Sequence, residues 1–591
     1  MNIKKQRTNS ATRAKIYSLA AVVAILLALA PLPPRAVALS LPSDTVRVGL
    51  YYGSNALPSA NLQNSVGYGY DFGYFDSDRK FVKLAEYTSG DSISMLRDVN
   101  MYYDSTNNAY KVGSTGNTVV GCFHIQFNNG RSSYADAVEA AQSQGIPNYF
   151  IKYVGGEFHV CSGNYTTAAA AETAMANLGF GGNAAVNAGT SQTISVVSTG
   201  TNRVIFEFDS SNVKLAVRPK SSGKALTWFK GYKYYGAFQY NRASGGDLTI
   251  INFVLMDDYV KGVLPYEMGN TWPLEALKAQ AVCARTYAAA NLDKHSSYGF
   301  DLCDTDDCQV YYGTNSANAL TDQAVNETAG MYITYNGAIC TTFYTASDGG
   351  ATESVVNVWG SSIPYLIGVT DPYEADVASQ ISNYAWTVKY TPQELTTRLN
   401  ARGYTCATIK SVAITSTTPT GNAKEITLTD VNGKVFTVTN GDRIRSAFGV
   451  PAIRFGVGGS TPDNGNSNSG ASSVYVLGNS GTISVNGDLF VVSANGSIES
   501  VSGGLYALSG DDVVEVTYSA DTSTGGGSSP SSDGKVDGNF VFQGFGRGHN
   551  VGMSQWGAYS MAKVHGKTFD EIIHFYFTGV EITYADGTRA I

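Results

Sequence analysis

A single carboxylate, Glu267, stands out in the stretch 259–287, which reads YVKGVLPYEMGNTWPLEALKAQAVCARTY. It is expected in a turn, where its neighbours Tyr266, Met268 and Trp272 could shield it from water. Burial raises the pKa of a carboxyl group, and a carboxyl group that titrates near neutrality can serve as general acid and then as general base. Glu267 is therefore the candidate catalytic residue.

A helix is predicted to follow this carboxylate, because small alanines recur along the segment and alanine has the highest helix propensity. Asn270 or Thr271 is expected to cap the helix, with Pro273 in its first turn. The basic residues Lys278 and Arg285 are seven positions apart and so share one face of the helix. That face could line a binding cleft, or it could be the salt-bridged edge of a buried core helix.

Three residues that commonly bind metals, His295, Cys303 and Cys308, lie close together in the sequence. Imidazole and thiolate groups are the usual ligands of structural zinc. The spacing reveals no fourth ligand, although an acidic residue could supply one: Asp304, Asp306 or Asp307. A disulfide between the two cysteines, or a pair of free thiols, is the alternative.

Glycine is frequent in the segment 542–558, which reads FQGFGRGHNVGMSQWGA. These glycines allow the main chain to approach a ligand closely, but the segment lacks the βαβ context of a dinucleotide-binding site. His549 within it is either a substrate-positioning residue or the donor of a structural hydrogen bond in a glycine-rich turn.

The runs GVLPYEM and TWPLEALKAQAVCARTYA resemble the signature of the SpoIID/LytB family, whose members act on bacterial peptidoglycan. SDGGATE at 347–353 and GHNVGMSQ at 548–555 resemble two further family segments. Asn550 stands where the family usually has glycine, and asparagine tolerates a left-handed backbone better than most residues. The resemblance implies that Glu267 is a general acid/base and that seven further residues bind or position substrate: Lys278, Arg285, Gln309, Ser347, His549, Ser554 and Gln555.

This resemblance implies a peptidoglycan lytic transglycosylase acting on denuded glycan strands in sporulation or cell-wall remodelling. Ordinary glycoside hydrolases use two carboxylates, whereas lytic cleavage needs one, and no second obvious acid lies near Glu267 in the sequence. The reaction requires no cofactor, and some family members carry a metal site in the segment that contains Cys303 and Cys308. The alternative is a non-catalytic, glycan-binding protein of the LytB branch that enhances a partner cell-wall amidase.

Alternating strands and helices predict an α+β chain of several domains. The strand and helix order of the segment 117–182 resembles the SPOR domain, a ferredoxin-like module that binds glycan strands stripped of stem peptides; a generic ferredoxin-like domain is the alternative. The segment 391–403 is predicted to be a helix capped by Thr391 and ended by Gly403. The expected organisation is a signal peptide at 1–38, a β-rich region at 44–116, the SPOR-like module at 117–182, a linker at 181–189, a discontinuous SpoIID-type catalytic domain at 190–456 and 538–591, and a β insertion at 473–520 between flexible linkers.

A formal net charge of −8 shows no overall excess of basic residues of the kind that nucleic-acid binding requires. Basic residues precede an apolar run at 16–30, and small residues follow at 36–38, as in a secretory signal. The chain is therefore expected to be secreted or extracytoplasmic, at the cell wall or the outer face of the membrane, with this signal or anchor as its only membrane contact. The seven cysteines are too sparse for a disulfide scaffold, although Cys122 and Cys161 could be neighbours on adjacent strands.

Overall fold

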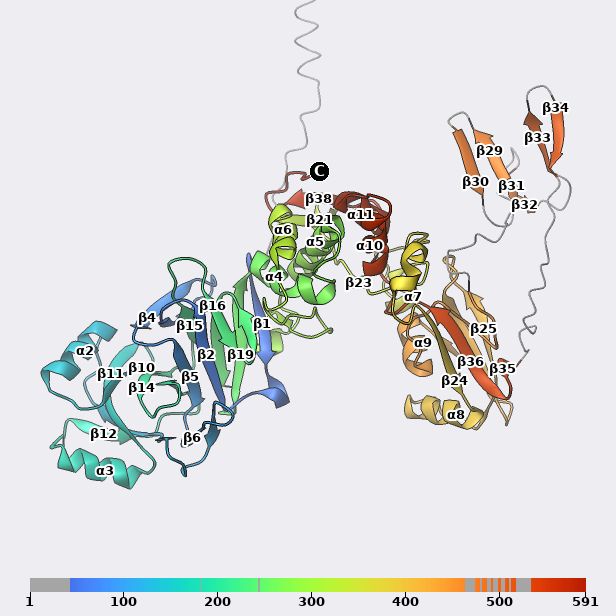
Figure 1. The fold of residues 1–591 in the computed structure, drawn as a ribbon. Coiled ribbons are helices and arrows are strands. Elements are labelled where there is room, and N and C mark those ends of the chain that lie inside the picture. Colours follow the sequence, from blue (N-terminus) through green and yellow to red (C-terminus); the bar gives the residue numbers. More distant parts are fainter. Residues whose placement is uncertain are drawn as a thin grey trace, which may run out of the picture.

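The computed structural model describes residues 43–180, 182–242, 245–462 and 533–591, together with strands between 474 and 516. These residues form an elongated molecule with a β-rich unit at one end, helices in the centre and a mixed α/β unit at the other end (Figure 1). The predicted α+β class is confirmed. Among the described residues no helix is both long enough and apolar enough to cross a bilayer, and the predicted signal peptide at 1–38 lies outside them.

The β-rich unit is built from two sheets whose strands come from both sides of residue 120. The order of the seven-stranded sheet is β20 (Leu302–Cys303), β1 (Thr45–Tyr51), β19 (Leu248–Leu255), β18 (Ala237–Arg242), β15 (Leu215–Pro219), β3 (Tyr70–Phe75) and β4 (Phe81–Tyr87). The order of the ten-stranded sheet is β12 (Ala184–Asn187), β9 (Phe123–Phe127), β11 (Glu157–Tyr165), β10 (Tyr149–Val154), β14 (Val204–Asp209), β13 (Ile194–Ser198), β5 (Ser92–Arg97), β2 (Ser59–Val66), β16 (Leu226–Phe229) and β17 (Tyr232–Tyr234).

The expected boundary between a separate N-terminal region and a catalytic domain starting at 190 is not seen. β1 pairs with β19, β3 with β15, and β5 with β13, so 45–97 and 194–255 interleave in one unit. The two sheets pack face to face through apolar side chains, with the rings of Phe72 and Phe206 stacked at 5.4 Å. Residues that alternate inward along both segments share this core, and neither segment could bury its apolar face alone.

The segment predicted as SPOR-like has the βαββαβ order of a ferredoxin-like fold. Its helices α2 (Tyr134–Ser143) and α3 (Ala168–Asn177) accompany four antiparallel strands in the order β12–β9–β11–β10. Strand β12 lies within the predicted linker at 181–189, because its small residues pair along the free edge of β9. The module is not detached, since β10 continues into the ten-stranded sheet by pairing with β14. Its glycan binding stays a prediction.

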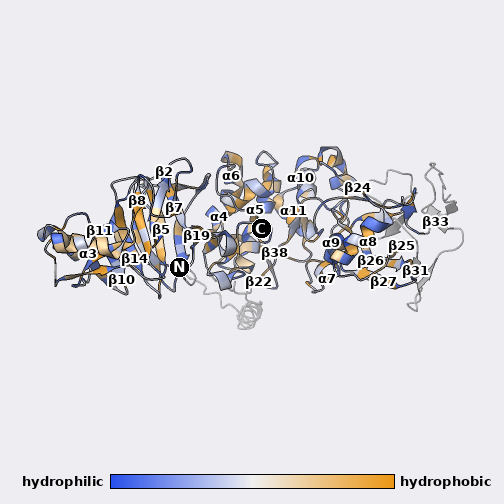
Figure 2. Cartoon of the chain, turned by 90° about the horizontal axis from the view of Figure 1, so that it is seen from below, coloured by the Kyte–Doolittle hydropathy of each residue, from blue (hydrophilic) through white to orange (hydrophobic). Residues whose placement is uncertain are grey.

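The centre of the molecule is helical. Helices α4 (Met256–Glu267), α5 (Leu274–Ala290) and α6 (Ala319–Glu327) pack together, and α10 (Gln555–Lys563) and α11 (Phe569–Tyr576) return from the end of the chain to lie on α5. Strand β38 (Glu581–Tyr584) pairs with β21 (Met331–Tyr335), which in turn pairs with β22 (Ala338–Ile339). The segment after residue 538 thus completes the structure begun at residue 256. Figure 2 shows α4, α5, α10 and α11 between the two outer units from a second direction.

The far unit contains the three strands β24 (Ala385–Tyr390), β36 (Asn539–Phe545) and β28 (Phe455–Val457) side by side, with β35 (Lys535–Val536) on β36. A second sheet comprises β25 (Ile409–Thr417), β26 (Ala423–Asp430) and β27 (Val435–Thr439). Helices α7 (Val355–Trp359), α8 (Pro392–Ala401) and α9 (Gly441–Phe448) accompany them. The predicted capping of α8 is confirmed, since Thr391 and Glu394 form a reciprocal capping box.

Within the predicted insertion the described strands pair only two by two, as β29 (Val474–Gly478) with β30 (Gly481–Val485), β31 (Phe490–Val492) with β32 (Ile498–Ser500), and β33 (Leu505–Ser509) with β34 (Asp512–Val516). All seven cysteines lie in the described part of the chain and are free thiols. Neither a Cys122–Cys161 nor a Cys303–Cys308 disulfide is present.

Candidate active site

Glu267 is the last residue of helix α4, not part of an isolated turn. Asp257 and Asp258 in the first turn favour the helix because they complement the positive end of its dipole. The helix stops after Glu267, where Met268 adopts an extended conformation with φ −124° and ψ 154°. The carboxyl group therefore lies at the negative end of the helix dipole, which disfavours its ionised form.

Two hydrogen bonds hold the half-buried carboxyl group of Glu267. Its Oε1 accepts the backbone N–H of Val310 at 2.9 Å, and its Oε2 accepts the side-chain amide of Gln555 at 3.4 Å. Burial raises the pKa of Glu267 above its usual value, and the negative charge of Asp306 raises it further, whereas the hydrogen bonds from Val310 and Gln555 and the nearby Tyr344 hydroxyl group oppose the rise. The site is one in which a carboxyl group can hold a proton and still meet a ligand.

The Val310 amide is positioned by close packing of its neighbour Tyr311 on helix α4. A Cβ at Gly262 would lie 2.4 Å from the Tyr311 ring, so only glycine allows the ring to pack there. The fully buried Tyr311 also donates a hydrogen bond to Asn252 Oδ1 at 2.6 Å. These contacts fix the loop after residue 308 against the helix that ends in Glu267.

Tyr344 is a component of the site that the sequence did not single out. Its buried hydroxyl group donates its one proton to Gln309 Oε1 at 2.9 Å and lies near the Glu267 carboxyl group. Gln309 in turn donates to Tyr259 at 3.1 Å and is itself buried. Gln309 was predicted to contact substrate, but the structure makes it the residue that orients Tyr344. The only sequence signal for Tyr344 is its place three residues before the SDGGATE run.

Gln555 reaches Glu267 because two distant strands meet. Strand β23 (Tyr344–Thr345) pairs in parallel with β37 (Met553–Ser554), which places the start of α10 beside the end of α4. On the same side Trp272 and Trp556 have ring centroids 4.6 Å apart, and Tyr559 packs on both. Both tryptophans are partly exposed, so they form an aromatic surface next to the carboxyl group.

The same segments carry the chain's similarity to known proteins. The sequence model of the SpoIID family, described as stage II sporulation protein, matches residues 244–335, which include Glu267 and Val310. An uncharacterized protein of Brachyspira hyodysenteriae is 30% identical over 355 residues, covering 60% of this chain and 73% of that protein. Stage II sporulation protein D of Bacillus subtilis is 26% identical over 347 residues, covering 56% of this chain and 75% of that protein. A Bacillus subtilis protein named amidase enhancer is 31% identical over 329 residues, covering 55% of this chain and 40% of that protein.

The chain belongs to the SpoIID/LytB family. Membership associates it with sporulation and the bacterial cell wall.

Lys278 and Arg285 do share one face of α5, as predicted, but this face packs on α6 and does not line the site. The ammonium group of Lys278 pairs with Glu275 at 2.8 Å and Glu327 at 2.6 Å. Arg285 is fully buried, pairs with Asp257 at 2.8 Å and donates to two main-chain oxygens, those of Val325 and Met331. The prediction that Arg285 contacts substrate is wrong, because the helix presents it to the core.

The predicted cap of α5 also differs. Helix α5 begins at Leu274 with Pro273 in the capping position and no side-chain hydrogen bond. Asn270 instead donates to the carbonyl of Ser316 and accepts from Asn318. Its amide therefore ties the turn after Glu267 to the loop before α6.

Ser347 and Ser554 of the family motifs lie beside a buried acidic cluster, formed by Asp348, Asp371 and Glu374. Ser554 caps α10 by accepting the Gly557 N–H and also donates to Glu374 at 3.4 Å. Burial raises the pKa of all three carboxyl groups, and the charges of the neighbouring carboxylates add to the rise for Asp348 and Glu374. Both serines are buried and neither has a hydrogen bond to Glu267 among the described residues.

The contacts of His549 support the second of its two interpretations, a structural residue in a glycine-rich turn. Its Nδ1 accepts the N–H of Val551 at 3.0 Å, and its ring lies 5.0 Å from that of Trp359. Burial, with the nearby charge of Arg445, lowers the pKa of His549 to about 4. Next to it Asn550 has φ +63°, as expected for a residue in place of glycine, and its side chain donates to the carbonyls of Asp348 and Ala351.

The predicted metal ligands meet, and the structure adds a fourth. One ligand atom each from His295, Cys303, Asp307 and Cys308 lies within 4.8 Å of the others. His295 Nε2 is 3.3 Å from Cys308 Sγ and 3.3 Å from Asp307 Oδ2. Two thiols, an imidazole and a carboxylate at such separations fit a tetrahedral zinc site. Asp307 was one of the acidic residues left open by the sequence.

Proposed function

We propose that this protein is a lytic transglycosylase that cleaves denuded peptidoglycan glycan strands with Glu267 as its only acid/base. The observation that carries the proposal is the environment of Glu267, a half-buried carboxyl group with a raised pKa and two positioned donors. Family membership supports the cell-wall context.

In this reaction the protonated Glu267 donates its proton to the glycosidic oxygen as the C1–O bond breaks. The resulting carboxylate then accepts the proton of the C6 hydroxyl group of the same muramic sugar. The C6 oxygen bonds to C1 and closes a 1,6-anhydro ring, so no water is consumed and Glu267 regains its proton. The Val310 N–H and the Gln555 amide stabilise the carboxylate between these steps.

Among the described residues, Asp306 is a carboxylate whose charge raises the Glu267 pKa, and it is exposed. A hydrolytic mechanism would need such a second carboxylate, whereas the lytic mechanism does not. The test compares wild type, Glu267→Gln and the matched control Asp306→Asn on amidase-treated glycan, with anhydromuramoyl ends counted by mass spectrometry. At a pH below the basic limb of each variant, we expect Glu267→Gln to lower turnover by at least about 100-fold and Asp306→Asn to retain most of it. Reducing ends that carry solvent ¹⁸O, or loss of activity in Asp306→Asn, would contradict the lytic mechanism.

The similarity to the relative named amidase enhancer favours a second candidate function. In that case the protein binds glycan and increases the rate of a cell-wall amidase without turnover of its own. Stimulation of an added amidase by Glu267→Gln, equal to that by wild type, together with no anhydromuramoyl product from wild type, would support this second function.

We also propose that the protein is exported, that the module at 123–187 binds denuded glycan as a SPOR domain does, and that the ligand set around Cys303 and Cys308 holds a structural zinc ion. A zinc ion there would supply a crosslink and no chemistry at the glycosidic bond. The residues after Cys308 lead directly to Gln309 and Val310, so the crosslink would brace the loop that contacts Glu267.

A further inference from the structure

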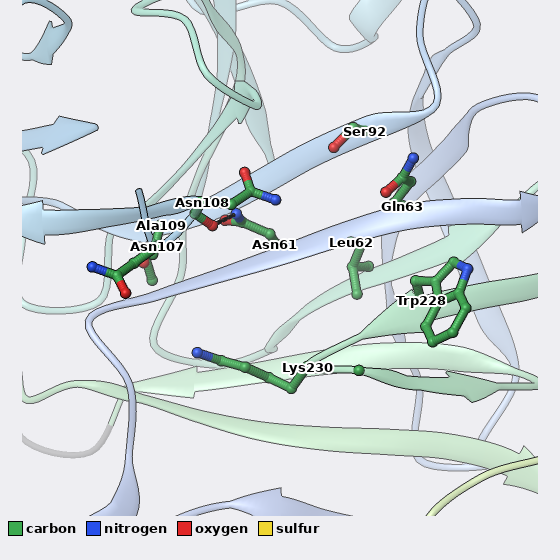
Figure 3. A pocket seen from close by; sticks show the side chains of 11 residues that line it. Asn61, Leu62, Gln63, Ser92, Asn107, Asn108, Ala109, Trp228 and Lys230 are labelled. Atoms are coloured by element: carbon green, nitrogen blue, oxygen red, sulfur yellow. Dashed lines mark hydrogen bonds between the residues drawn. The ribbon is translucent and has the colours of Figure 1, made fainter. Parts of the chain in front are cut away.

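A polar groove separate from the site around Glu267 lies in the β-rich unit, on the outer face of the ten-stranded sheet. It encloses about 330 Å³, a volume at the lower end of the roughly 300–1,000 Å³ of small-molecule sites. Strands β2 and β5 form its floor, the turn between β6 (Met101–Asp104) and β7 (Ala109–Val112) forms one side, and the β16–β17 hairpin forms the other. Figure 3 shows the side chains that line it.

The floor presents polar side chains in cross-strand register. Trp228 pairs with Gln63, and Gln63 pairs with Ser92, so these three side chains form one row. Asn61 adds a second amide, whose Oδ1 accepts a hydrogen bond from Ser94 at 2.7 Å and whose Nδ2 donates to the Asn108 carbonyl. The alternate residues of β2 point into the core, where Leu62 is fully buried, so the polar row is a consequence of strand periodicity.

Several of these groups are available to a ligand. In the described part of the chain no hydrogen bond is formed by the side chains of Gln63 and Ser92, the indole N–H of Trp228 or the ammonium group of Lys230. The Trp228 ring is fixed from one side by Lys233, whose Nζ lies 4.9 Å from the ring centroid. An aromatic ring beside one free amide, one free hydroxyl group and one free cation is the composition of a saccharide site, because sugar C–H faces stack on aromatic rings while hydroxyl and acetamido groups bond to polar side chains.

The groove is connected by direct contacts to the loop that holds Glu267. The hairpin that bears Trp228 and Lys230 packs on residues 312–315, where Tyr232 stacks on Tyr312 at 5.3 Å and Asn315 donates to the Gly231 carbonyl. Tyr266, the residue before Glu267, donates to the carbonyl of the same Tyr312. These contacts place the groove and the candidate active site on neighbouring parts of the molecule, so one polymer chain could reach both.

We propose that this groove is a second saccharide subsite, which binds an N-acetylated amino sugar of the same glycan polymer that Glu267 cleaves. The inference rests on the proposed function for the identity of the polymer. Trp228 stacks on the sugar ring, the amides of Asn61 and Gln63 bond to its acetamido and hydroxyl groups, and Lys230 pairs with a lactyl carboxylate. The subsite adds affinity for long strands without taking part in the chemistry.

The test measures equilibrium binding of denuded glycan strands and of chitin oligosaccharides to the full chain carrying Glu267→Gln, which removes turnover. Trp228→Ala in that background should weaken binding of both ligands by about tenfold. Lys230→Gln should weaken only the glycan with lactyl carboxylates. The matched control is Tyr68→Ala, which removes an exposed aromatic ring of the same unit outside the groove. Unchanged melting temperatures exclude unfolding as the cause.

The outcomes separate this inference from the proposed function. If the wild type cleaves glycan but Trp228→Ala does not change binding, the proposed subsite is wrong and the proposed enzymatic function stands. If binding depends on Trp228 but the wild type cleaves no glycan, the proposed subsite stands and the proposed enzymatic function is wrong. Trp228-dependent binding of a free stem peptide but not of glycan overturns the assignment to a saccharide.

Discussion

Glu267 owes its chemistry to neighbours that are remote in the sequence. Val310 and Gln555 donate to its two oxygens, and Tyr344 connects it to Gln309. Burial is the largest influence on its pKa and raises it. At this scale the site consists of one acid and the groups that tune it.

The pH profile of the reaction should report this tuning. Glu267 must be protonated to act as the acid, so kcat/KM should fall as the pH rises through its raised pKa. Asp306→Asn should move this basic limb to lower pH, because the Asp306 charge raises the Glu267 pKa. Gln555→Leu should move it to higher pH, because the amide stabilises the carboxylate. Each shift is expected to be about one pH unit or less.

The control for these profiles is His549, whose pKa of about 4 keeps it neutral over the range of the basic limb. His549→Gln should therefore leave the basic limb of the pH profile at the same pH, even if it changes the rate. If neither Asp306→Asn nor Gln555→Leu moves the basic limb, a group other than Glu267 donates the proton.

At the scale of secondary-structure elements, helix α5 and the loop after it have roles that differ from those the family motif suggests. The basic face of α5 holds α6, through Lys278 and Arg285. The loop after α5 supplies the donor to Glu267, and it is anchored at β20, whose Leu302 and Cys303 pair with Val48 and Gly49 of β1. The candidate zinc ligands lie at this anchor.

Zinc analysis of the purified protein checks this arrangement. We expect about one zinc ion per chain, lost in Cys303→Ser and Cys308→Ser, with a melting temperature lowered by several degrees because metal binding stabilises the folded state. Cys406→Ser is the matched control, since Cys406 lies after α8 and away from the cluster. Full metal content in both cluster variants would contradict the site.

On the scale of the whole molecule, one chain folds back on itself twice. The strands before residue 98 pair with strands after residue 193, and the segment after 538 completes the helices and sheets of 256–457. The ferredoxin-like module and the strands between 474 and 516 are inserted into these two frameworks. The candidate catalytic and zinc residues and the groove residues thus belong to these two frameworks, while the described strands of the second insertion pair only with each other.

Removal of that second insertion should therefore be tolerated. β28 and β36 pair directly, with Phe455 opposite Gly544, so a short Gly-Ser linker in place of 463–532 can join them. We expect the melting temperature to change by no more than about 2 °C and glycan cleavage to persist. Phe542→Ala in the shortened chain is the contrasting variant, since it empties a fully buried position in β36 and should lower the melting temperature. A large loss of stability from the deletion alone would show that the insertion is part of the framework.

The sequence by itself determined the local features of this protein. Alanine content predicts α5, the capping pattern predicts α8, the seven-residue spacing puts Lys278 and Arg285 on one face, and the motif singles out Glu267. These depend on residues within a few turns of one another. Only the tertiary structure decided that the basic face turns inward, that Tyr344 and Val310 meet Glu267, that Asp307 joins the cysteines, and that 44–97 shares its core with 194–255. The physical reason is that burial and hydrogen bonding between distant segments depend on strand pairing, which a local pattern does not specify.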